Sequence, residues 1–167
     1  MNTSLFSSSD QSWETPQPFF DALNRHFCFD LDVCATPLTA KTTRYCVPPE
    51  AVRAWGRRTF RRIFTHALVD GLAQPWTGRR CWMNPPYGRE IGAWVAKARR
   101  EAEAGSLIVG LLPARTDAAW WQDNVQGHAD VRFVRGRLKF GNAANSAPFP
   151  SAIAVWWGWP VLQGGFV

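Results

Sequence analysis

Apolar residues recur along the chain at two different spacings, and the order of these spacings predicts a mixed α/β fold. Apolar residues three or four positions apart favour amphipathic helices, whereas short alternating or continuous apolar runs favour strands. Helices are predicted at residues 15–27, 50–64, 88–105 and 116–127. Strands are predicted at residues 29–35, 79–83, 106–113, 129–136 and 151–159. The stretch between the first strand and the second helix, residues 37–50, is rich in turn-forming residues and is expected to be a connection.

The second half of the chain holds the most strongly specified elements. The helix predicted over residues 88–105 carries Ile91 and Trp94 on one face and ends at Gly105. The next segment, residues 106–113, is a continuous apolar run of strand length. Such a run is typical of a central strand in a parallel sheet, because both faces of that strand are covered.

Single residues are expected to start, interrupt or cap the other predicted helices. Pro16 is expected to open the first helix, because proline is well suited to the first helical position. Gly56 weakens the middle of the helix predicted at 50–64, since glycine is a poor helix former. Thr116 is expected to cap the helix at 116–127.

The alternation of strands and helices predicts an α/β sheet with helices on both faces. Ligands bind outside the carboxyl ends of the strands in sheets of this kind. Asp32 and Asn84 both lie where a predicted strand ends, so we expect them to face one crevice. We expect one domain over residues 13–167, preceded by a flexible polar arm over 1–12.

Composition narrows the class of protein. The chain has 167 residues, of which 46% are apolar and 19% charged, and this is the composition of a globular domain. The net charge of +6 favours a polyanionic partner such as nucleic acid. No run of 18 apolar residues occurs, so no membrane span is predicted, and the polar start is not expected to be a signal peptide.

Metal chemistry gains no support from the cysteines and histidines. The cysteines form no CxxC pair, have no histidine at zinc-finger spacing, and are expected to be free thiols in a reducing cytoplasm. They are Cys28, Cys34, Cys46 and Cys81. The scattered histidines accompany no nucleophile motif, so neither a hydrolase nor a metal site is predicted.

The most informative stretch follows the strand predicted at 79–83 and consists of Asn84, Pro85, Pro86 and Tyr87. An exocyclic amine on a planar base is a poor nucleophile, because its lone pair is delocalised into the ring. Two acceptors on its N–H bonds would localise that lone pair, and the Asn84 side-chain oxygen and the Pro85 carbonyl can supply them. Tyr87 offers a ring on which a base can stack, and the prolines hold the geometry. The four residues therefore favour a catalytic site for methylation of an amine.

The NPPY word and its surroundings resemble the phage-type (Dam-like) DNA N6-adenine methyltransferases, which use S-adenosylmethionine. The resemblance covers most of the chain, in the order WETPQPFFDAL, FDLDVCA, DGLAQPWTG, WMNPPYG, LLPARTDAAWW, RGRLKF and APFPSAIAVW. It implies a single Rossmann-like methyltransferase domain with a mostly parallel twisted sheet and an antiparallel last strand. It also implies that the chain methylates a flipped-out adenine in DNA, without a metal, in the cytoplasm of a bacterial host of a phage or prophage.

The resemblance implies which residues meet the methyl donor. Thr15 and Pro16 resemble the donor-binding turn of these enzymes, and Asp32 and Ala35 lie in the segment of the first strand that ends at the donor. Asp30 is the alternative to Asp32. Asp70 looks like the acidic residue that receives the donor's adenine amino group. The chain has no glycine-rich GxGxxG turn, which a pyrophosphate would need and S-adenosylmethionine does not.

Two basic segments are candidates for contact with DNA. The first is an arginine-rich insertion over residues 47–69, where arginines can neutralise phosphates or remain on a solvated surface. The second is the polar loop before the last strand, where basic groups can hold phosphate and asparagines can reach base edges. The candidate residues are Arg53, Arg57, Arg58, Arg61, Arg62, Arg137, Lys139, Asn142 and Asn145.

Two alternatives stay open at this stage. Related words of Asn, Asp or Ser followed by Pro-Pro and an aromatic residue serve the same chemistry on cytosine N4, on a guanine amine in RNA or on a protein glutamine. A chain that has lost catalysis, such as a prophage remnant, would bind DNA but not the methyl donor.

Overall fold

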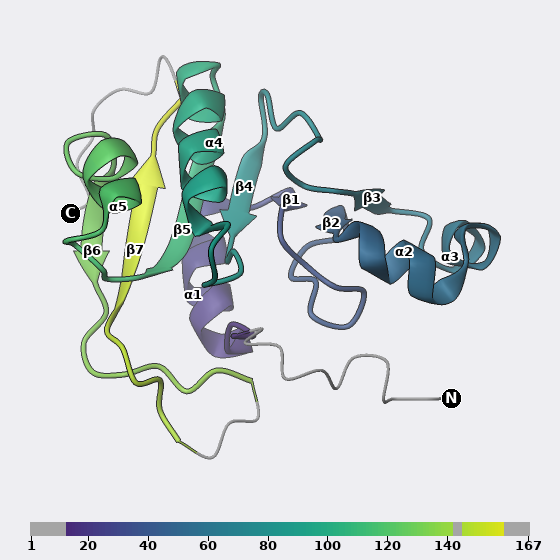
Figure 1. Cartoon of the computed structure of the whole chain (residues 1–167), viewed down its shortest axis with the longest axis horizontal. Helices are drawn as coiled ribbons and strands as arrows, with labels where there is room; N and C mark the ends of the chain where they lie inside the picture. Colours follow the sequence, from purple (N-terminus) through teal and green to yellow (C-terminus); the bar gives the residue numbers. More distant parts are fainter. Residues whose placement is uncertain (1–12, 142–144, 159–167) are drawn as a thin grey trace.

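The computed structural model describes residues 13–141 and 145–158, so the arm predicted at 1–12 lies outside the described residues. A seven-stranded sheet in the order β3-β2-β1-β4-β5-β7-β6 forms the centre (Figure 1). The strands are β1 (Leu31–Asp32), β2 (Tyr45–Val47), β3 (Ala67–Val69), β4 (Arg80–Met83), β5 (Leu107–Pro113), β6 (Asp130–Phe133) and β7 (Ser151–Trp156). The helices are α1 (Gln17–Phe27), α2 (Pro49–Trp55), α3 (Arg57–Ile63), α4 (Ile91–Glu103) and α5 (Ala119–Asn124).

The strand directions confirm the predicted fold class. Strands β3, β2, β1, β4 and β5 pair in parallel, whereas β7 runs antiparallel to both of its neighbours, β5 and β6. All residues of β5 and β7 are buried, as expected for strands at the centre of a covered sheet. Because β7 reverses direction, the loop between β6 and β7 lies at the carboxyl edge of the parallel strands.

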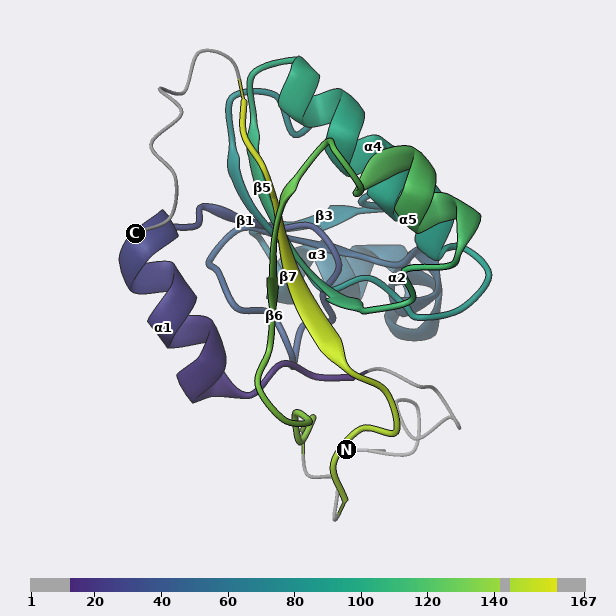
Figure 2. The same cartoon turned by 90° about the vertical axis from the view of Figure 1, so that its left-hand side faces the viewer.

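Helices cover both faces of the sheet, as the sequence predicts. Helix α1 lies on one face, and α4 and α5 lie on the other (Figure 2). Helix α1 packs through Phe20, whose ring meets Trp82 of β4 edge to face at 5.6 Å. Helix α4 buries Ile91, Trp94 and Val95. Among the described residues, no helix is long and apolar enough to cross a bilayer.

Two of the predicted helices differ from the prediction. The helix expected over residues 50–64 is interrupted at Gly56, which adopts a φ of 73° and joins α2 to α3. The predicted cap at Thr116 is wrong, because α5 begins three residues later, after Ala118, and no side chain caps it. Both differences concern short helices whose ends are set by backbone geometry.

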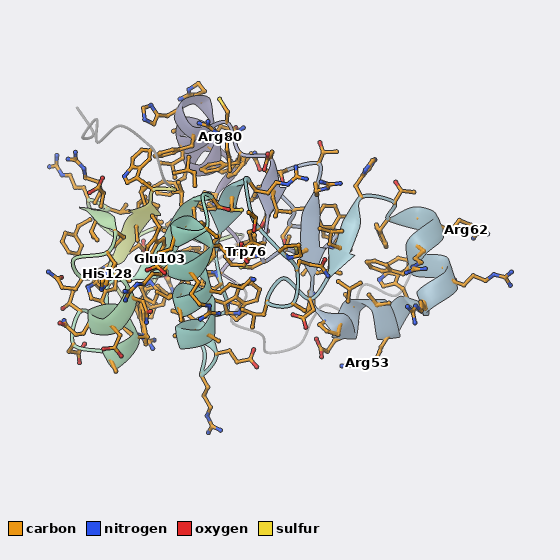
Figure 3. The ribbon with its side chains drawn as sticks, turned by 90° about the horizontal axis from the view of Figure 1, so that it is seen from above. Arg53, Arg62, Trp76, Arg80, Glu103 and His128 are labelled. Atoms are coloured by element: carbon orange, nitrogen blue, oxygen red, sulfur yellow. The ribbon has the colours of Figure 1, made fainter. Side chains whose placement is uncertain are left out.

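The connection predicted at 37–50 contains strand β2, and the segment 47–69 contains β3. Both strands have three residues, and they pair with each other from Tyr45 opposite Ala67 to Val47 opposite Val69. The segment 47–69 therefore contributes an edge strand to the sheet. Its helices α2 and α3 lie beside that edge, and Arg53 and Arg62 stand at its periphery (Figure 3). We call these two helices, Pro49–Ile63, the arginine arm.

Candidate active site

The side chain of Asn84 lies directly after β4, at the carboxyl edge of the sheet. Its amide nitrogen donates hydrogen bonds to the Trp13 carbonyl at 2.5 Å and to the Thr15 hydroxyl at 3.0 Å. Its amide oxygen, Oδ1, is buried and has no hydrogen-bond partner among the described residues. A buried acceptor without a partner is costly, so a ligand that donates a hydrogen bond there would remove the cost.

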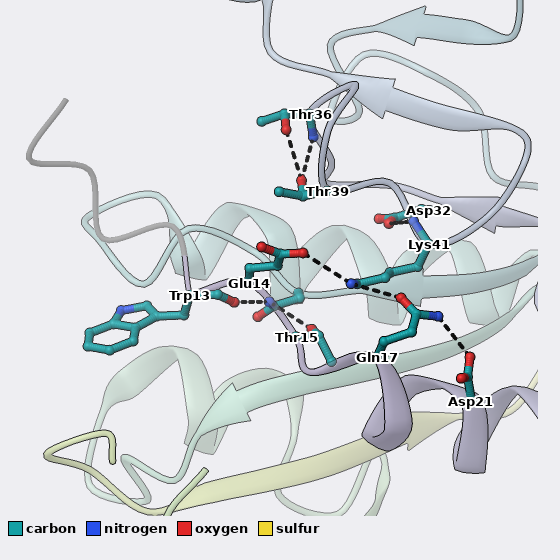
Figure 4. Close-up of polar contacts among 10 residues, drawn as sticks. Trp13, Glu14, Thr15, Gln17, Asp21, Asp32, Thr36, Thr39 and Lys41 are labelled. Atoms are coloured by element: carbon teal, nitrogen blue, oxygen red, sulfur yellow. Dashed lines mark hydrogen bonds and ion pairs between the residues drawn. The ribbon is translucent and has the colours of Figure 1, made fainter. Parts of the chain in front are cut away.

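The segment Trp13–Gln17 ties this asparagine to the neighbouring loops (Figure 4). Lys41 donates from its ammonium group to Glu14 at 3.3 Å and to Gln17 at 3.1 Å, and only 6% of its side chain is exposed. On the other side, the amide of Gly141 donates to the Glu14 carbonyl at 2.8 Å. Three loops of the carboxyl edge thus meet at one short segment. We call Trp13–Gln17 together with Asn84 the Asn84 corner.

Asp32 ends β1 and is buried beside this corner. Its two carboxylate oxygens accept backbone N–H bonds from Cys34 at 3.2 Å and from Lys41 at 3.0 Å, which hold the loop after β1. Burial raises the pKa of Asp32 to about 6, although these hydrogen bonds and the Lys41 charge act in the opposite direction. The alternative carboxylate, Asp30, precedes β1 and faces Arg79 at 3.8 Å at the amino edge. Of the two, only Asp32 lies on the side of Asn84.

The other residues predicted to meet the donor lie at the same edge. Ala35 is buried and donates its amide to the Cys46 carbonyl at 2.9 Å. Asp70 follows β3 with a φ of 60°, and its carboxylate accepts the amide of Leu72 at 3.1 Å. The adjacent Gly71 allows a close approach, because a Cβ there would lie 2.1 Å from the Val33 carbonyl oxygen.

Tyr87 is more enclosed than a free stacking face would be. Its ring is 4% exposed, and its hydroxyl donates to the Leu111 carbonyl at 3.1 Å. Phe149 and Phe140 meet the ring edge to face at 5.5 and 6.3 Å. Trp13 contacts the same two phenylalanines at 5.1 and 5.4 Å. We call these four residues the aromatic cluster. Pro85 is buried and Pro86 is exposed beside it.

Several residues of this site were not predicted from the sequence. The Trp13 carbonyl carries no side-chain signal, and Lys41 lies in a segment that resembles a plain connection. Phe140 and Phe149 did carry a signal, because they are apolar residues in an otherwise polar loop between two strands. An aromatic residue in such a loop indicates that the loop packs against something.

The basic candidates flank the Asn84 corner on both sides. Arg53, Arg57 and Arg61 line a groove of about 680 Å³ between the arginine arm and β3. Its floor includes the apolar side chains of Val52, Phe60 and Leu68. Arg58 and Arg62 are exposed but are not part of this lining in the described structure.

The second basic group lies at the other end of the sheet. Arg137 and Lys139 are exposed in the loop between β6 and β7, as is Asn145, whereas Asn142 lies outside the described residues. Since β4 lies between this loop and the arginine arm in the strand order, Asn84 is placed between two exposed positive surfaces. Residues 13–141 and 145–158 bring together no group of three His, Cys, Asp or Glu side chains that could hold a metal.

The sequence of the chain is similar to sequences of known proteins. A family model described as DNA N-6-adenine-methyltransferase (Dam) matches residues 56–155. A DNA N-6-adenine-methyltransferase of Haemophilus phage HP1 is 25% identical over 146 residues, which cover 85% of this chain and 73% of that protein.

Solved structures share the fold at low identity. A SAM-dependent O-methyltransferase from Thermotoga maritima is 6% identical with a TM-score of 0.51, over 88% of this chain and 66% of that one. A precorrin-6y C5,15-methyltransferase from Geobacter metallireducens is 11% identical with a TM-score of 0.50, over 88% and 91%. These similarities show a Rossmann-like methyltransferase fold.

Proposed function

Because the chain belongs to the DNA N-6-adenine-methyltransferase (Dam) family, we propose that it transfers a methyl group from S-adenosylmethionine to the N6 amine of a flipped-out adenine in DNA. The observation that carries this proposal is the Asn84 side chain, whose amide nitrogen is held by the protein and whose oxygen is left as a buried acceptor. An N–H of an amine is a donor that can satisfy such an acceptor, and an adenine amine has a second N–H for the Pro85 carbonyl.

The carboxyl edge offers groups that fit the methyl donor. S-adenosylmethionine supplies a methyl group on a positively charged sulfur, with an amino-acid end and an adenine. Asp32 lies at the end of β1 and Asp70 directly after β3, and the Thr15–Pro16 turn and Ala35 lie at the same edge of the sheet. Carboxylates near a cationic ligand favour its binding. We assign the donor to this edge, with Thr15, Pro16, Asp32, Ala35 and Asp70 as its neighbours.

The chemistry asks little of the protein beyond positioning. Asn84 Oδ1 would accept one N–H of the adenine amine, and the Pro85 carbonyl would accept the other. Both bonds become stronger as the nitrogen turns tetrahedral, so they stabilise the transition state more than the ground state. A bond forms from nitrogen to the methyl carbon while the carbon–sulfur bond breaks and its electron pair stays on sulfur, so that neutral S-adenosylhomocysteine leaves. The methylated nitrogen, now positively charged, then gives one proton to water.

The aromatic cluster is where the base would enter. Unstacking a base from the duplex costs a few kcal/mol, and stacking on an aromatic ring returns ~1–3 kcal/mol. The Tyr87 ring is covered by Phe140 and Phe149, so an entering base must displace part of these contacts or stack on the cluster's outer side. Stacking of the base on these rings would offset part of the cost of leaving the duplex.

The two basic surfaces would hold the duplex on either side of the corner. Arginine and lysine side chains that contact phosphates position DNA without reading its sequence. We propose that the arginine arm, through Arg53, Arg57, Arg58, Arg61 and Arg62, holds one flank. The loop with Arg137, Lys139, Asn142 and Asn145 would hold the other flank and reach base edges. The relative from a Haemophilus phage supports a phage or prophage origin and action in the bacterial cytoplasm.

The decisive experiment identifies the product. The protein is incubated with unmethylated DNA and methyl-labelled S-adenosylmethionine, the DNA is digested, and the modified nucleoside is identified by mass spectrometry. We expect N6-methyladenosine in its deoxy form. N4-methylcytosine would overturn the adenine assignment, and label found only in added RNA or protein would overturn the DNA assignment.

A binding measurement separates an enzyme from a catalytically dead DNA-binding remnant. A ligand at a hundred times its Kd stabilises the folded state by about 2.7 kcal/mol. Saturating S-adenosylmethionine should therefore raise the melting temperature, and an equal concentration of methionine serves as the control. An unchanged melting temperature at saturating S-adenosylmethionine would refute the hypothesis that the chain is an active methyltransferase.

A further inference from the structure

We propose that Trp13 and Thr15 are positioning residues that fix the orientation of the Asn84 amide so that its oxygen, and not its nitrogen, faces the adenine amine that receives the methyl group. This inference rests on the proposed function and extends it to residues that do not touch the reacting atoms. It explains why a segment before the first helix contacts an asparagine about 70 positions later in the chain.

An asparagine amide has two ends of similar shape and opposite hydrogen-bonding character. The oxygen accepts and the NH2 group donates. If the group turned by half a revolution, the NH2 would point at the adenine amine, which is itself a donor, and activation of the nitrogen would be lost. The reaction therefore depends on which end faces the substrate, and the protein must decide this before the base arrives.

The hydrogen bonds of the Asn84 amide nitrogen fix this orientation. A main-chain carbonyl can only accept, so the Trp13 carbonyl at 2.5 Å requires a donor opposite it. A reversed amide would set two oxygens against each other at that distance. The Thr15 hydroxyl, at 3.0 Å, accepts the second N–H of the same group. Both hydrogens of the NH2 are thus used, and Oδ1 is left as a buried acceptor without a partner among the described residues.

The Thr15 hydroxyl makes no capping hydrogen bond at the start of α1. Pro16 is the N-cap of α1, and no side chain makes a capping hydrogen bond there. Thr15 is 2% exposed, so its hydroxyl is not a solvent-facing group. A threonine before a proline at a helix start would ordinarily suggest a cap; here its hydroxyl instead receives the Asn84 amide.

The Trp13 carbonyl is itself held in place from both sides. The Trp13 ring packs against Phe140 and Phe149, and the next carbonyl, that of Glu14, accepts the Gly141 amide. The position of the acceptor that orients Asn84 therefore depends on the loop between β6 and β7. That loop carries residues proposed to meet DNA, so the orientation of the amide and the entry of the base share one structural support.

The test replaces the threonine hydroxyl by a methyl group of nearly the same volume. Thr15→Val removes the acceptor, and Thr15→Ser, the matched control, keeps it. In single-turnover methylation of DNA we expect roughly tenfold slower transfer for Thr15→Val, as for the loss of one ordinary hydrogen bond, and a rate within about twofold of wild type for Thr15→Ser. The rates are measured at saturating S-adenosylmethionine and DNA, so that a change in donor affinity, which the place of Thr15 at the donor edge allows, does not enter the comparison.

A second readout does not depend on turnover. The side-chain NH2 signals of Asn84 can be assigned in a 15N spectrum by their loss in Asn84→Ala. Held by two buried acceptors, these hydrogens should exchange slowly in the wild type and in Thr15→Ser, and at least several-fold faster in Thr15→Val. In an Asn84→Ala background, Thr15→Val should cause no further loss of rate, because no amide is left to orient.

The outcomes separate this inference from the proposed function. If the wild-type protein methylates DNA and Thr15→Val does so at the same rate with unchanged exchange, the positioning role is refuted and the function stands. If Thr15→Val raises only the Kd for S-adenosylmethionine and transfers methyl at the wild-type rate once the donor is saturating, Thr15 acts as a donor ligand alone and the inference is likewise refuted. If the wild-type protein methylates no DNA but slow exchange of the Asn84 amide disappears in Thr15→Val, the proposed function fails and the orienting contact remains.

Discussion

The Asn84 corner and the arginine arm are built in opposite ways. The corner draws together residues 13–17, the loop after β1 and the end of β4, and Thr15 and the Asn84 amide oxygen at its centre are buried, with the amide held by hydrogen bonds. The arm consists of consecutive residues, Pro49–Ile63, and its arginines are exposed. A reaction needs atoms held at set distances, which distant segments can enforce. Attraction of a polyanion needs charge, which a short exposed stretch can supply.

The two regions also differ in how they are attached to the core. The arm has a small cluster of its own, formed by Val47, Ala51 and Phe60. The corner rests on the main core through the aromatic cluster and Trp82. Surface changes on the arm should therefore leave the corner unchanged, and substitution of Asn84 should leave the arm's contribution to DNA binding unchanged. The following predictions test that separation.

Removal of the Asn84 side chain should have the largest effect. Asn84→Ala should slow methyl transfer by roughly three orders of magnitude, the scale found when one preorganised polar group at a transition state is deleted. Single-turnover rates measure this, and donor and DNA affinities should stay near wild type. A rate close to wild type would show that the buried oxygen has no catalytic role, and the contrast with the arm would disappear.

Burial of Asp32, beside the corner, should make the stability of this region depend on pH, in contrast to the exposed arm. Since burial raises the pKa of Asp32 from 3.8 to about 6, the folded protein binds this proton more tightly than the unfolded chain. The contribution of Asp32 to stability is then fully present below about pH 4 and is lost as the pH rises through 6. A shift of about two pKa units corresponds to roughly 3 kcal/mol.

The difference in unfolding free energy between wild type and Asp32→Asn isolates this group, because all other titrations cancel. It should change by that amount between pH 4 and 7 and level off above pH 7. A flat difference curve would mean that Asp32 is well solvated, and the description of the corner as a buried polar site would fail.

The smallest effect should come from the arm, where two pairs of arginines on one helix allow a matched comparison. Arg57 and Arg61 line the groove, whereas Arg58 and Arg62 do not, and both pairs lie on α3. Replacement of either pair by alanine removes the same charge. If each groove arginine contacts one phosphate, Arg57→Ala with Arg61→Ala should reduce the slope of log K against log salt by about 1.8.

The matched control, Arg58→Ala with Arg62→Ala, should reduce that slope by less than half as much as the groove variant does. Rates at saturating DNA should be unchanged in both variants, since neither touches the corner. Equal slopes would mean that the whole arm acts as a diffuse charge and that the groove has no special part. A lower rate at saturating DNA would couple the arm to the corner and break the separation.

The sequence predicted the elements that depend on local pattern. The helix expected at 88–105 is α4, and the apolar run at 106–113 is β5. The apolar pattern of each segment is long enough to specify one type of element. Strands β2 and β3 were not predicted, since three residues carry little pattern and these strands exist through their pairing with each other. The interruption at Gly56 was indicated only as a weakness, because propensity does not reveal a positive φ.

For the site, chemistry was predictable and contacts were not. The NPPY word indicated Asn84 as an acceptor, because the residue types alone define that role. The Trp13 carbonyl cannot be recognised as its partner from sequence, since every residue has a carbonyl. The burial of Tyr87 depends on Phe140 and Phe149, which lie more than fifty positions later. Only the folded chain brings these rings together.

The reversed direction of β7 has a consequence for how relatives of this chain can diverge. Because β7 runs antiparallel to β5, the residues between Phe133 and Ser151 enter and leave on the side of the sheet that carries Asn84. Surface loops tolerate insertions and deletions far better than strands do. If this loop reaches base edges, as we propose, changes in its length would alter which bases are admitted without shifting the register of any strand. Under that proposal, recognition sequences can change through the loop while the residues of the Asn84 corner stay the same.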